Sequence, residues 1–183
     1  LFKPSLNFMP DATSLLKVAA DLQQHIQQFF SEHTNDNLVY HNQSHTTYVA
    51  NAAAEIASHY QLNETDFFTA VAAAWFHDIG YYINPAVHEE IGASLASEFL
   101  TNRNIDAAII EAVQKCIIAT KLPQQPHTLL EQIVCDADLY HLGTDDFPDK
   151  NKLLRKEVMA LKGIEISGSE WRKQTIKLFE QHH

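Results

Sequence analysis

Apolar residues recur at steps of three and four positions along nearly the whole chain, which is the spacing of one face of an α-helix. The clearest example is the run Leu15, Val18, Leu22, Ile26 and Phe29. No segment of four to eight residues shows a sustained alternation of apolar and polar side chains, and five glycines are too few for the turns of most all-β folds. The sequence therefore predicts an all-α fold.

Helix start and stop signals divide the chain into roughly eight helices. Asn63 and the capping box formed by Thr128 and Glu131 mark two of the starts. At 183 residues the chain is expected to form one domain, 1–183, with a core of about 11–161 and a C-terminal helical extension over 162–183. The predicted helices span about 13–30, 42–60, 63–76, 87–101, 104–121, 128–143, 148–162 and 168–181.

The charge balance is acidic, because 13 basic and 23 acidic residues give a formal net charge of −10 at pH 7. Such a chain repels phosphate backbones and anionic lipids, so we expect neither a nucleic-acid polymer nor a membrane as partner. A small phosphate ligand remains compatible, because a bound metal inverts the local charge. Two cysteines form no disulfide framework, and without a signal peptide the expected location is the cytoplasm. The sequence leaves a homo-oligomer open.

A histidine–aspartate pair, His77 and Asp78, directly follows the segment 67–76, in which only Thr69 is polar. A helix that is apolar on every side is usually central. A buried, unpaired carboxylate would cost several kcal/mol, so Asp78 needs a partner. A metal ion would supply one, because imidazole nitrogen and carboxylate oxygen suit divalent transition metals. The alternative is a capped helix end, with Asp78 accepting hydrogen bonds from backbone N–H groups.

Two further pairs of polar residues occupy similar positions. His41 and His45 lie four residues apart, hence on one helix face if a helix begins there. The alternative is that His41 caps the helix and His45 packs in the core. Asp136 and Asp138 interrupt an otherwise apolar stretch. The alternative to a role in a site is that one of these two aspartates stabilises the helix by its charge and the other is an ordinary surface residue.

The three motifs in this order, Tyr-His-Asn-x-x-His, His-Asp and Asp-Ala-Asp-Leu, resemble the HD superfamily of metal-dependent phosphohydrolases. The resemblance covers about 11–161 and implies an HD-type helical domain. The tract Asp-Ala-Asp-Leu-Tyr-His-Leu-Gly and the later Leu-Leu-Arg-Lys-Glu are similar to a subgroup of small bacterial HD-domain proteins. The implied cofactor is one divalent metal: Mn, Fe, Co, Ni, Zn or Mg. The implied ligands are His45, His77, Asp78 and Asp138.

The resemblance also implies catalytic roles. Asp138, not Asp136, matches the family's ligand position. His41 matches the histidine that protonates the leaving oxygen in related cyclic-nucleotide phosphodiesterases. Asp78 is expected to act in catalysis as well as in metal binding.

A second metal is less expected. His88 stands in a motif that resembles the one supplying a histidine to a second metal in dinuclear HD members, but Ala119 occupies the place of their further histidine. His88 and Glu89 are therefore expected to contact a metal ligand or the substrate. His88 could instead be an exposed residue at a helix start.

Several further positions carry polar side chains whose role the sequence leaves open or assigns to solvent. Lys121 could meet a substrate phosphate or the carbonyl groups at a helix C-terminus. His141 lies three residues after Asp138, so it is expected to support the site or to pack as an ordinary interfacial residue. Arg155 and Lys156 could form a phosphate patch, but Glu157 beside them indicates a solvated helix face.

The functional prediction is a phosphohydrolase that cleaves a phosphate ester with metal-activated water, with His41 as general acid. The expected substrate is a small phosphorylated molecule, a nucleotide or a nucleotide-derived signal. The bond remains open among monoester, cyclic diester, pyrophosphate and triphosphate. The alternative is a non-catalytic sensor that binds metal or nucleotide and signals to a partner.

Overall fold

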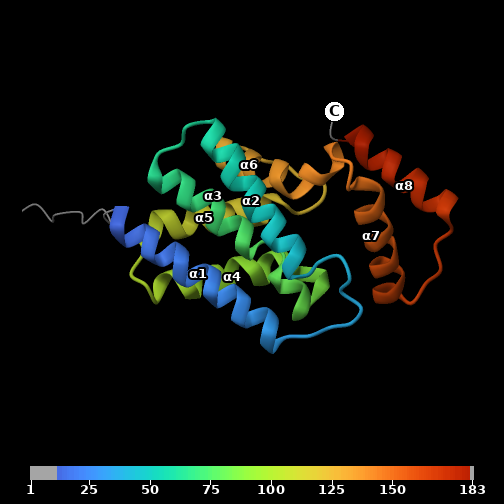
Figure 1. Ribbon diagram of the computed structural model, residues 1–183, viewed down its shortest axis with the longest axis horizontal. Coiled ribbons are helices and arrows are strands. Elements are labelled where there is room, and N and C mark those ends of the chain that lie inside the picture. The colour runs from blue at the N-terminus through green and yellow to red at the C-terminus, as the bar shows by residue number, and fades with distance from the viewer. Residues whose placement is uncertain (1–11, 182–183) are drawn as a thin grey trace, which may run out of the picture.

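The computed structural model describes residues 12–181, so residues 1–11 and 182–183 of the predicted domain lie outside it. Within the described range the chain forms eight α-helices and no strand, which confirms the all-α prediction (Figure 1). None of these helices is both long and apolar enough to cross a membrane. The helices are α1 (Ala12–Glu32), α2 (Gln43–His59), α3 (Glu64–Phe76), α4 (His88–Thr101), α5 (Ala107–Ala119), α6 (Leu129–Leu139), α7 (Phe147–Lys162) and α8 (Gly168–Gln181).

Side-chain caps begin the helices that carry the site. The Asn42 side chain accepts hydrogen bonds from the backbone N–H groups of Ser44 (2.9 Å) and His45 (3.2 Å), so α2 starts at Gln43. At α6 the Thr128 hydroxyl accepts the N–H of Glu131 at 3.3 Å, as in the predicted capping box, while the Glu131 carboxylate accepts the N–H of His127 at 2.6 Å in place of that of Thr128. Each cap satisfies backbone donors that would otherwise lack a partner at a helix start.

Helix α3 lies at the centre, surrounded by α1, α2, α4, α5 and α6 (Figure 1). Its alanines and aromatic residues are almost all buried, and the small side chains let neighbouring helices approach closely. A Cβ at Gly92 would lie 2.5 Å from the carbonyl oxygen of Phe76, so α4 crosses directly over the end of α3. The residues that follow α3 are therefore enclosed by several helices.

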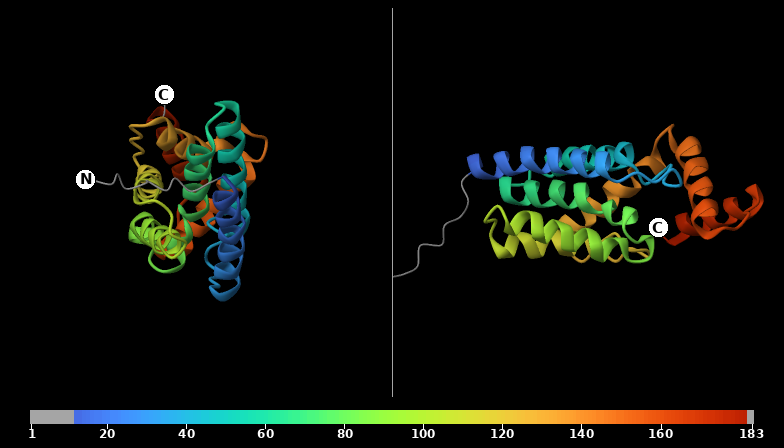
Figure 2. Two further views of the ribbon diagram at one scale, coloured as in Figure 1. Left: turned by 90° about the vertical axis from the view of Figure 1, so that its left-hand side faces the viewer. Right: turned by 90° about the horizontal axis from the view of Figure 1, so that it is seen from below.

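Two short 3-10 helices, η1 (Ile79–Tyr82) and η2 (Pro85–Val87), connect α3 to α4. A third, η3 (Tyr140–Gly143), follows α6, so the helix predicted over 128–143 ends as an α-helix at Leu139. Helices α7 and α8 stand at one end of the bundle that α1–α6 form (Figure 2).

Candidate metal centre

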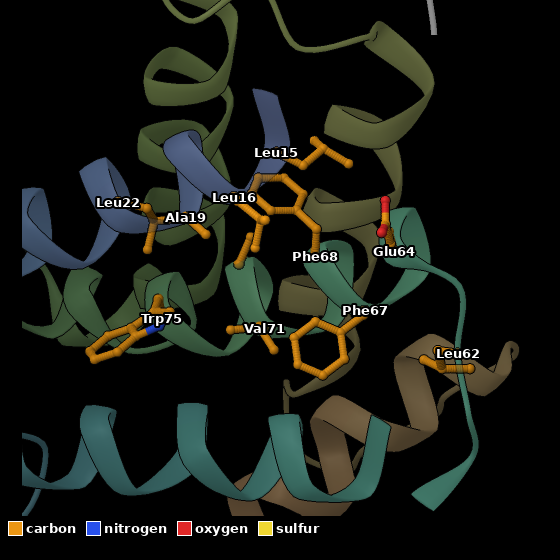
Figure 3. Close-up of a pocket in the computed structure, with 11 residues that line it drawn as sticks. Leu15, Leu16, Ala19, Leu22, Leu62, Glu64, Phe67, Phe68, Val71 and Trp75 are labelled. Atoms are coloured by element: carbon orange, nitrogen blue, oxygen red, sulfur yellow. The ribbon is translucent and has the colours of Figure 1, made fainter. Parts of the chain in front are cut away.

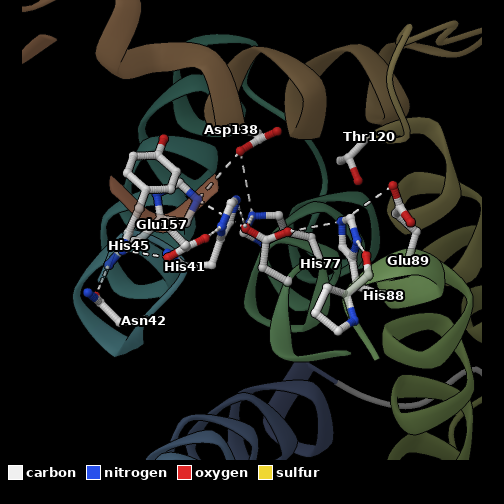
Figure 4. A network of polar contacts seen from close by, with 12 residues as sticks. His41, Asn42, His45, His77, His88, Glu89, Thr120, Asp138 and Glu157 are labelled. Carbon is white, nitrogen blue, oxygen red and sulfur yellow. Dashed lines mark hydrogen bonds and ion pairs between the residues drawn. The ribbon is translucent and has the colours of Figure 1, made fainter. Parts of the chain in front are cut away.

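Four side chains from the ends of three helices converge beside the end of α3 (Figure 4). His45 lies in the first turn of α2, Asp138 near the end of α6, and His77 and Asp78 directly after α3. Each offers one nitrogen or oxygen atom, and these four atoms lie within 4.8 Å of one another. The histidines and Asp78 are buried, while Asp138 is partly exposed.

The Nε2 atoms of His45 and His77, which point into this cluster, lack hydrogen-bond partners. The Nε2 atom of His77 lies 2.9 Å from Oδ2 of Asp78, and Nε2 of His45 lies 3.1 Å from the same oxygen. Neither nitrogen makes a hydrogen bond, although both are buried. The opposite ring nitrogen of His77 donates to the carbonyl of Ala74 at 2.7 Å, which directs the Nε2 lone pair into the cluster. Two imidazoles whose Nε2 atoms are unsatisfied, together with two carboxylates, fit a divalent cation.

The clustered carboxylates and imidazoles shift one another's pKa values strongly. Burial alone would lower the pKa of His77, but the Asp78 and Asp138 carboxylates outweigh burial and hold that pKa well above its ordinary value. Burial alone would raise the pKa of Asp78, but the neighbouring imidazoles, His77 first, hold it well below the ordinary value. The pKa of His45 is also raised, by Asp138 and Asp78 against the effect of burial. A divalent cation would replace these protons.

The two aspartates of α6 point in different directions. Asp138 faces the cluster, and its Oδ1 lies 3.6 Å from Nε2 of both His45 and His77. Asp136 is exposed, as expected for positions about 200° apart around a helix. Gln124, which the sequence did not single out, donates to the other oxygen of Asp138 at 3.3 Å.

A cavity of about 230 Å³ opens at the cluster. Asp78 and Asp138 form part of its wall, and Tyr81 and Thr120 form other parts. His45 and His77 lie behind these residues and do not line the cavity. A small molecule in this cavity would therefore meet the carboxylate side of the cluster.

His41 lines the same cavity, but it precedes α2 instead of lying on it. Its Nε2 atom lies 3.8 Å from Oδ2 of Asp78, and its ring stacks on Tyr81 with centroids 3.9 Å apart. Its Nδ1 atom contacts the carboxylate of Glu157. His41 thus precedes the helix, as the predicted bounds of 42–60 imply, so it does not share a helix face with His45, and the cap is Asn42 and not His41.

The prediction that Glu157 lies on a solvated face is wrong, because this side chain is only 1 % exposed. Its partners are the backbone N–H groups of Tyr40 (2.7 Å) and His41 (3.0 Å) and the ring of His41. The neighbouring Lys156 is exposed. Nothing local reveals this burial, because the partners lie 116 and 117 residues earlier in the chain.

A family model described as HD domain matches residues 42–143. The chain belongs to the HD domain family. The matched segment contains the four clustered residues but neither His41 nor Glu157. A crystal structure of a predicted HD superfamily hydrolase from an uncultured Thermotogales bacterium has the same fold, with a TM-score of 0.60 and 23 % identity over 89 % of each chain. A comparison with curated proteins found no match.

The HD domain presents His88 and Glu89 at the cavity on the first turn of α4. The Nε2 atom of His88 lies 3.6 Å from Oδ1 of Asp78 and 3.3 Å from Oε1 of Glu89. Its ring also lies against Tyr81, with centroids 3.9 Å apart. His88 is therefore partly enclosed and faces Asp78, in contrast to an exposed residue at a helix start.

Lys121 lines the cavity, whereas His141 does not. Lys121 lies at its rim, where its ammonium group pairs with Glu90 of α4. His141 is buried behind the cluster, and its ring nitrogens contact the backbone carbonyl of Asp138 (3.2 Å) and the hydroxyl of Tyr40 (3.3 Å). Burial lowers the pKa of His141. His141 thus contacts the main chain of Asp138 but does not line the cavity.

A separate cavity of about 320 Å³ lies between α1 and α3 (Figure 3). Its wall is formed mainly by apolar side chains such as Leu15, Phe67 and Trp75, and Glu64 is the one ionisable residue among those that line it. Chemistry on a phosphate needs several convergent polar groups, so the cavity at the metal cluster is the candidate reaction site.

Proposed function

We propose that this HD domain protein is a metal-dependent phosphohydrolase that acts on a phosphate ester. The observation that carries the proposal is the convergence of His45, His77, Asp78 and Asp138 at a cavity that His41 also faces. Metal-ligating atoms and a candidate proton donor would then act on one bound molecule. A purely structural helical module would leave this buried polar cluster without a purpose.

His45, His77, Asp78 and Asp138 would hold the cation. A divalent cation at this position supplies Lewis-acid polarisation of a phosphoryl oxygen and makes water a better nucleophile at neutral pH. The His77 ring is kept in place for this task by the carbonyl of Ala74. The Asp78 oxygen that faces His88, Oδ1 at 3.6 Å from its Nε2 atom, would accept a proton from the attacking water.

His41 would give a proton to the leaving oxygen. Imidazole titrates near neutrality, so it suits this role. The His41 ring lines the cavity, its Nε2 atom lies 3.8 Å from Oδ2 of Asp78, and it is not one of the four residues whose donor atoms lie within 4.8 Å of one another. His41 can therefore reach a substrate oxygen without being a metal ligand.

The substrate class that we propose is a nucleotide or a nucleotide-derived signal. The cavity of about 230 Å³ suits a phosphoryl group, with His88 and Lys121 beside it. It shares Lys121 and Leu122 with a larger groove of about 1340 Å³ along α4 and α5, into which a sugar and base would extend. The chain has a formal net charge of −10, which would repel an anionic substrate. A bound cation would make the local charge positive and so attract that substrate to the cavity.

The test is a metal and substrate screen. Metal-depleted protein is reconstituted separately with Mn, Fe, Co, Ni, Zn or Mg and assayed against p-nitrophenyl phosphate, bis(p-nitrophenyl) phosphate and a panel of nucleotides. Thermal melting with the same compounds is measured in parallel. Turnover that depends on metal and is absent in His77→Ala supports the proposal. A melting shift without turnover would favour a sensor that binds its ligand without cleaving it.

A further inference from the structure

The helical hairpin of α7 and α8 begins after the segment that the HD family model matches, which ends at residue 143. It stands at one end of the bundle, and most of its surface is solvent-exposed (Figure 2). Glu157 is nevertheless one of the most completely buried side chains among the described residues, at 1 % exposed. A helix that packs mainly at the periphery thus places one carboxylate inside the molecule.

Every close donor around this carboxylate belongs to the chain that precedes α2. Oε2 accepts the backbone N–H groups of Tyr40 and His41, and Oε1 contacts Nδ1 of His41 (Figure 4). A buried carboxylate is stable only when its oxygens are satisfied. These three donors meet that requirement without a lysine or arginine. The Glu157 carboxylate therefore fixes the backbone at Tyr40 and His41 and, within that segment, the ring of His41.

The contact also determines which nitrogen of His41 faces the cavity. A carboxylate can only accept, so Nδ1 carries the hydrogen that points to Glu157. The other nitrogen, Nε2, is left on the side of Asp78. Tyr81 lies flat against the same ring, with planes 10° apart, and limits its rotation. Both the tautomer and the ring plane are thus set by contacts outside the metal cluster.

We propose that Glu157 is a positioning residue that presents Nε2 of His41 to the leaving oxygen of the substrate, so that the hairpin completes the reaction site. This inference rests on the proposed phosphohydrolase function. In the reacting form His41 carries hydrogens on both ring nitrogens. Attack of water forms one P–O bond and gives the proton of the water to the Asp78 carboxylate, while the bond to the leaving group breaks. The electron pair of the broken bond stays on the leaving oxygen and takes the proton from Nε2. The neutral ring keeps its Nδ1–H, still donated to Glu157.

Glu157→Gln tests this assignment because an amide has one accepting and one donating end. The two backbone N–H groups require the amide oxygen where Oε2 now lies. The NH₂ group then faces Nδ1 of His41, which must become an acceptor. The variant should therefore move the ring hydrogen from Nδ1 to Nε2. Glu165→Gln, an exposed change of the same charge in the loop between α7 and α8, is the matched control.

The first measurement is independent of turnover. Metal-free protein carrying ¹⁵N-histidine is examined by long-range ¹H–¹⁵N correlation at about pH 8, where an ordinary imidazole is neutral. Wild type and Glu165→Gln should show Nδ1–H for His41, and Glu157→Gln should show Nε2–H. If the tautomer is unchanged in Glu157→Gln, the positioning role is overturned. If Glu157→Gln does not fold, Glu157→Asp replaces it and should retain Nδ1–H, whereas Nε2–H in that variant would overturn the role.

The second measurement is a double-mutant cycle on turnover, with p-nitrophenyl phosphate as a good leaving group and phenyl phosphate as a poor one. Glu157→Gln should lower kcat for the poor leaving group about 10–100-fold, with metal content and KM nearly unchanged. In a His41→Ala background it should cause no further loss. An equal further loss in that background would mean a merely structural role. If wild type hydrolyses neither compound or any other ester, the proposed function fails, and the tautomer measurement alone decides the positioning role.

Discussion

The cluster of His45, His77, Asp78 and Asp138 and the His41–Glu157 pair differ in where along the chain their residues come from. The cluster joins residues at the ends of α2, α3 and α6, all inside the segment that defines the family. The pair joins a turn before α2 to a helix after that segment, across 116 residues. Residues in the cluster are placed by the packed core itself, whereas His41 depends on one added helix. This difference predicts that variants in the two regions fail in different ways.

The largest effect is expected from His77→Ala. This change removes a fully buried nitrogen from the cluster, so metal affinity should fall more than about 100-fold and turnover should fall to background. Metal content after dialysis, measured by elemental analysis, checks the result. His59→Ala, at the exposed end of α2, is the control and should keep its metal. A His77→Ala protein with full metal content would remove the cluster from the proposed chemistry.

His41→Ala should separate the two regions most clearly. The metal should stay bound, because His41 is not among the four clustered residues. Hydrolysis of esters with poor leaving groups should fall roughly 10²–10⁴-fold, and esters with good leaving groups should suffer less. Steady-state kinetics on both kinds of ester check this prediction. Equal losses on both would instead indicate a role in substrate positioning, and loss of the metal would make His41 a ligand.

A smaller effect is expected when the two aspartates of α6 are compared. Asp138→Asn keeps an amide oxygen at the cluster but loses the charge, so metal affinity should fall about 10–100-fold. Asp136→Asn changes an exposed side chain and should leave metal affinity nearly unchanged. Calorimetric titration of each variant with metal measures the difference. The reverse ranking would mean that the wrong aspartate is assigned to the cluster.

The smallest expected effect is the pH dependence of metal affinity. The pKa of His77 is held well above its ordinary value, and that of His45 is also raised. Both rings therefore hold a proton more firmly than an ordinary imidazole in the metal-free protein, His77 most of all, and a cation must displace the protons that they carry. Affinity should fall as pH is lowered, already above pH 6.5, by up to about tenfold per pH unit for each proton displaced. Titrations in two buffers of different ionisation enthalpy count these protons, and a count of zero at pH 7 would contradict the prediction.

The sequence by itself determined the helical class, most helix bounds and the HD motifs. Helical spacing, caps such as Asn63 and the polar residues at the end of an apolar helix are local signals. Because His77 and Asp78 follow the central helix, their burial was predictable from the residues around them. Asp138 was separable from Asp136 by their angle around one helix together with the family motif.

Only the tertiary structure decided what surrounds His41. The sequence left open whether His41 shares a helix face with His45 or caps the helix, and the cap at Asn42 leaves it in the preceding turn. Glu157 was expected in solvent and is buried, because its partners come from the segment before α2. Periodicity describes neighbours within one helix, but it carries no information about which distant segment supplies a donor to a carboxylate. Packing of α7 against the turn at Tyr40 and His41 makes that choice, and it also decides which ring nitrogen faces the cavity.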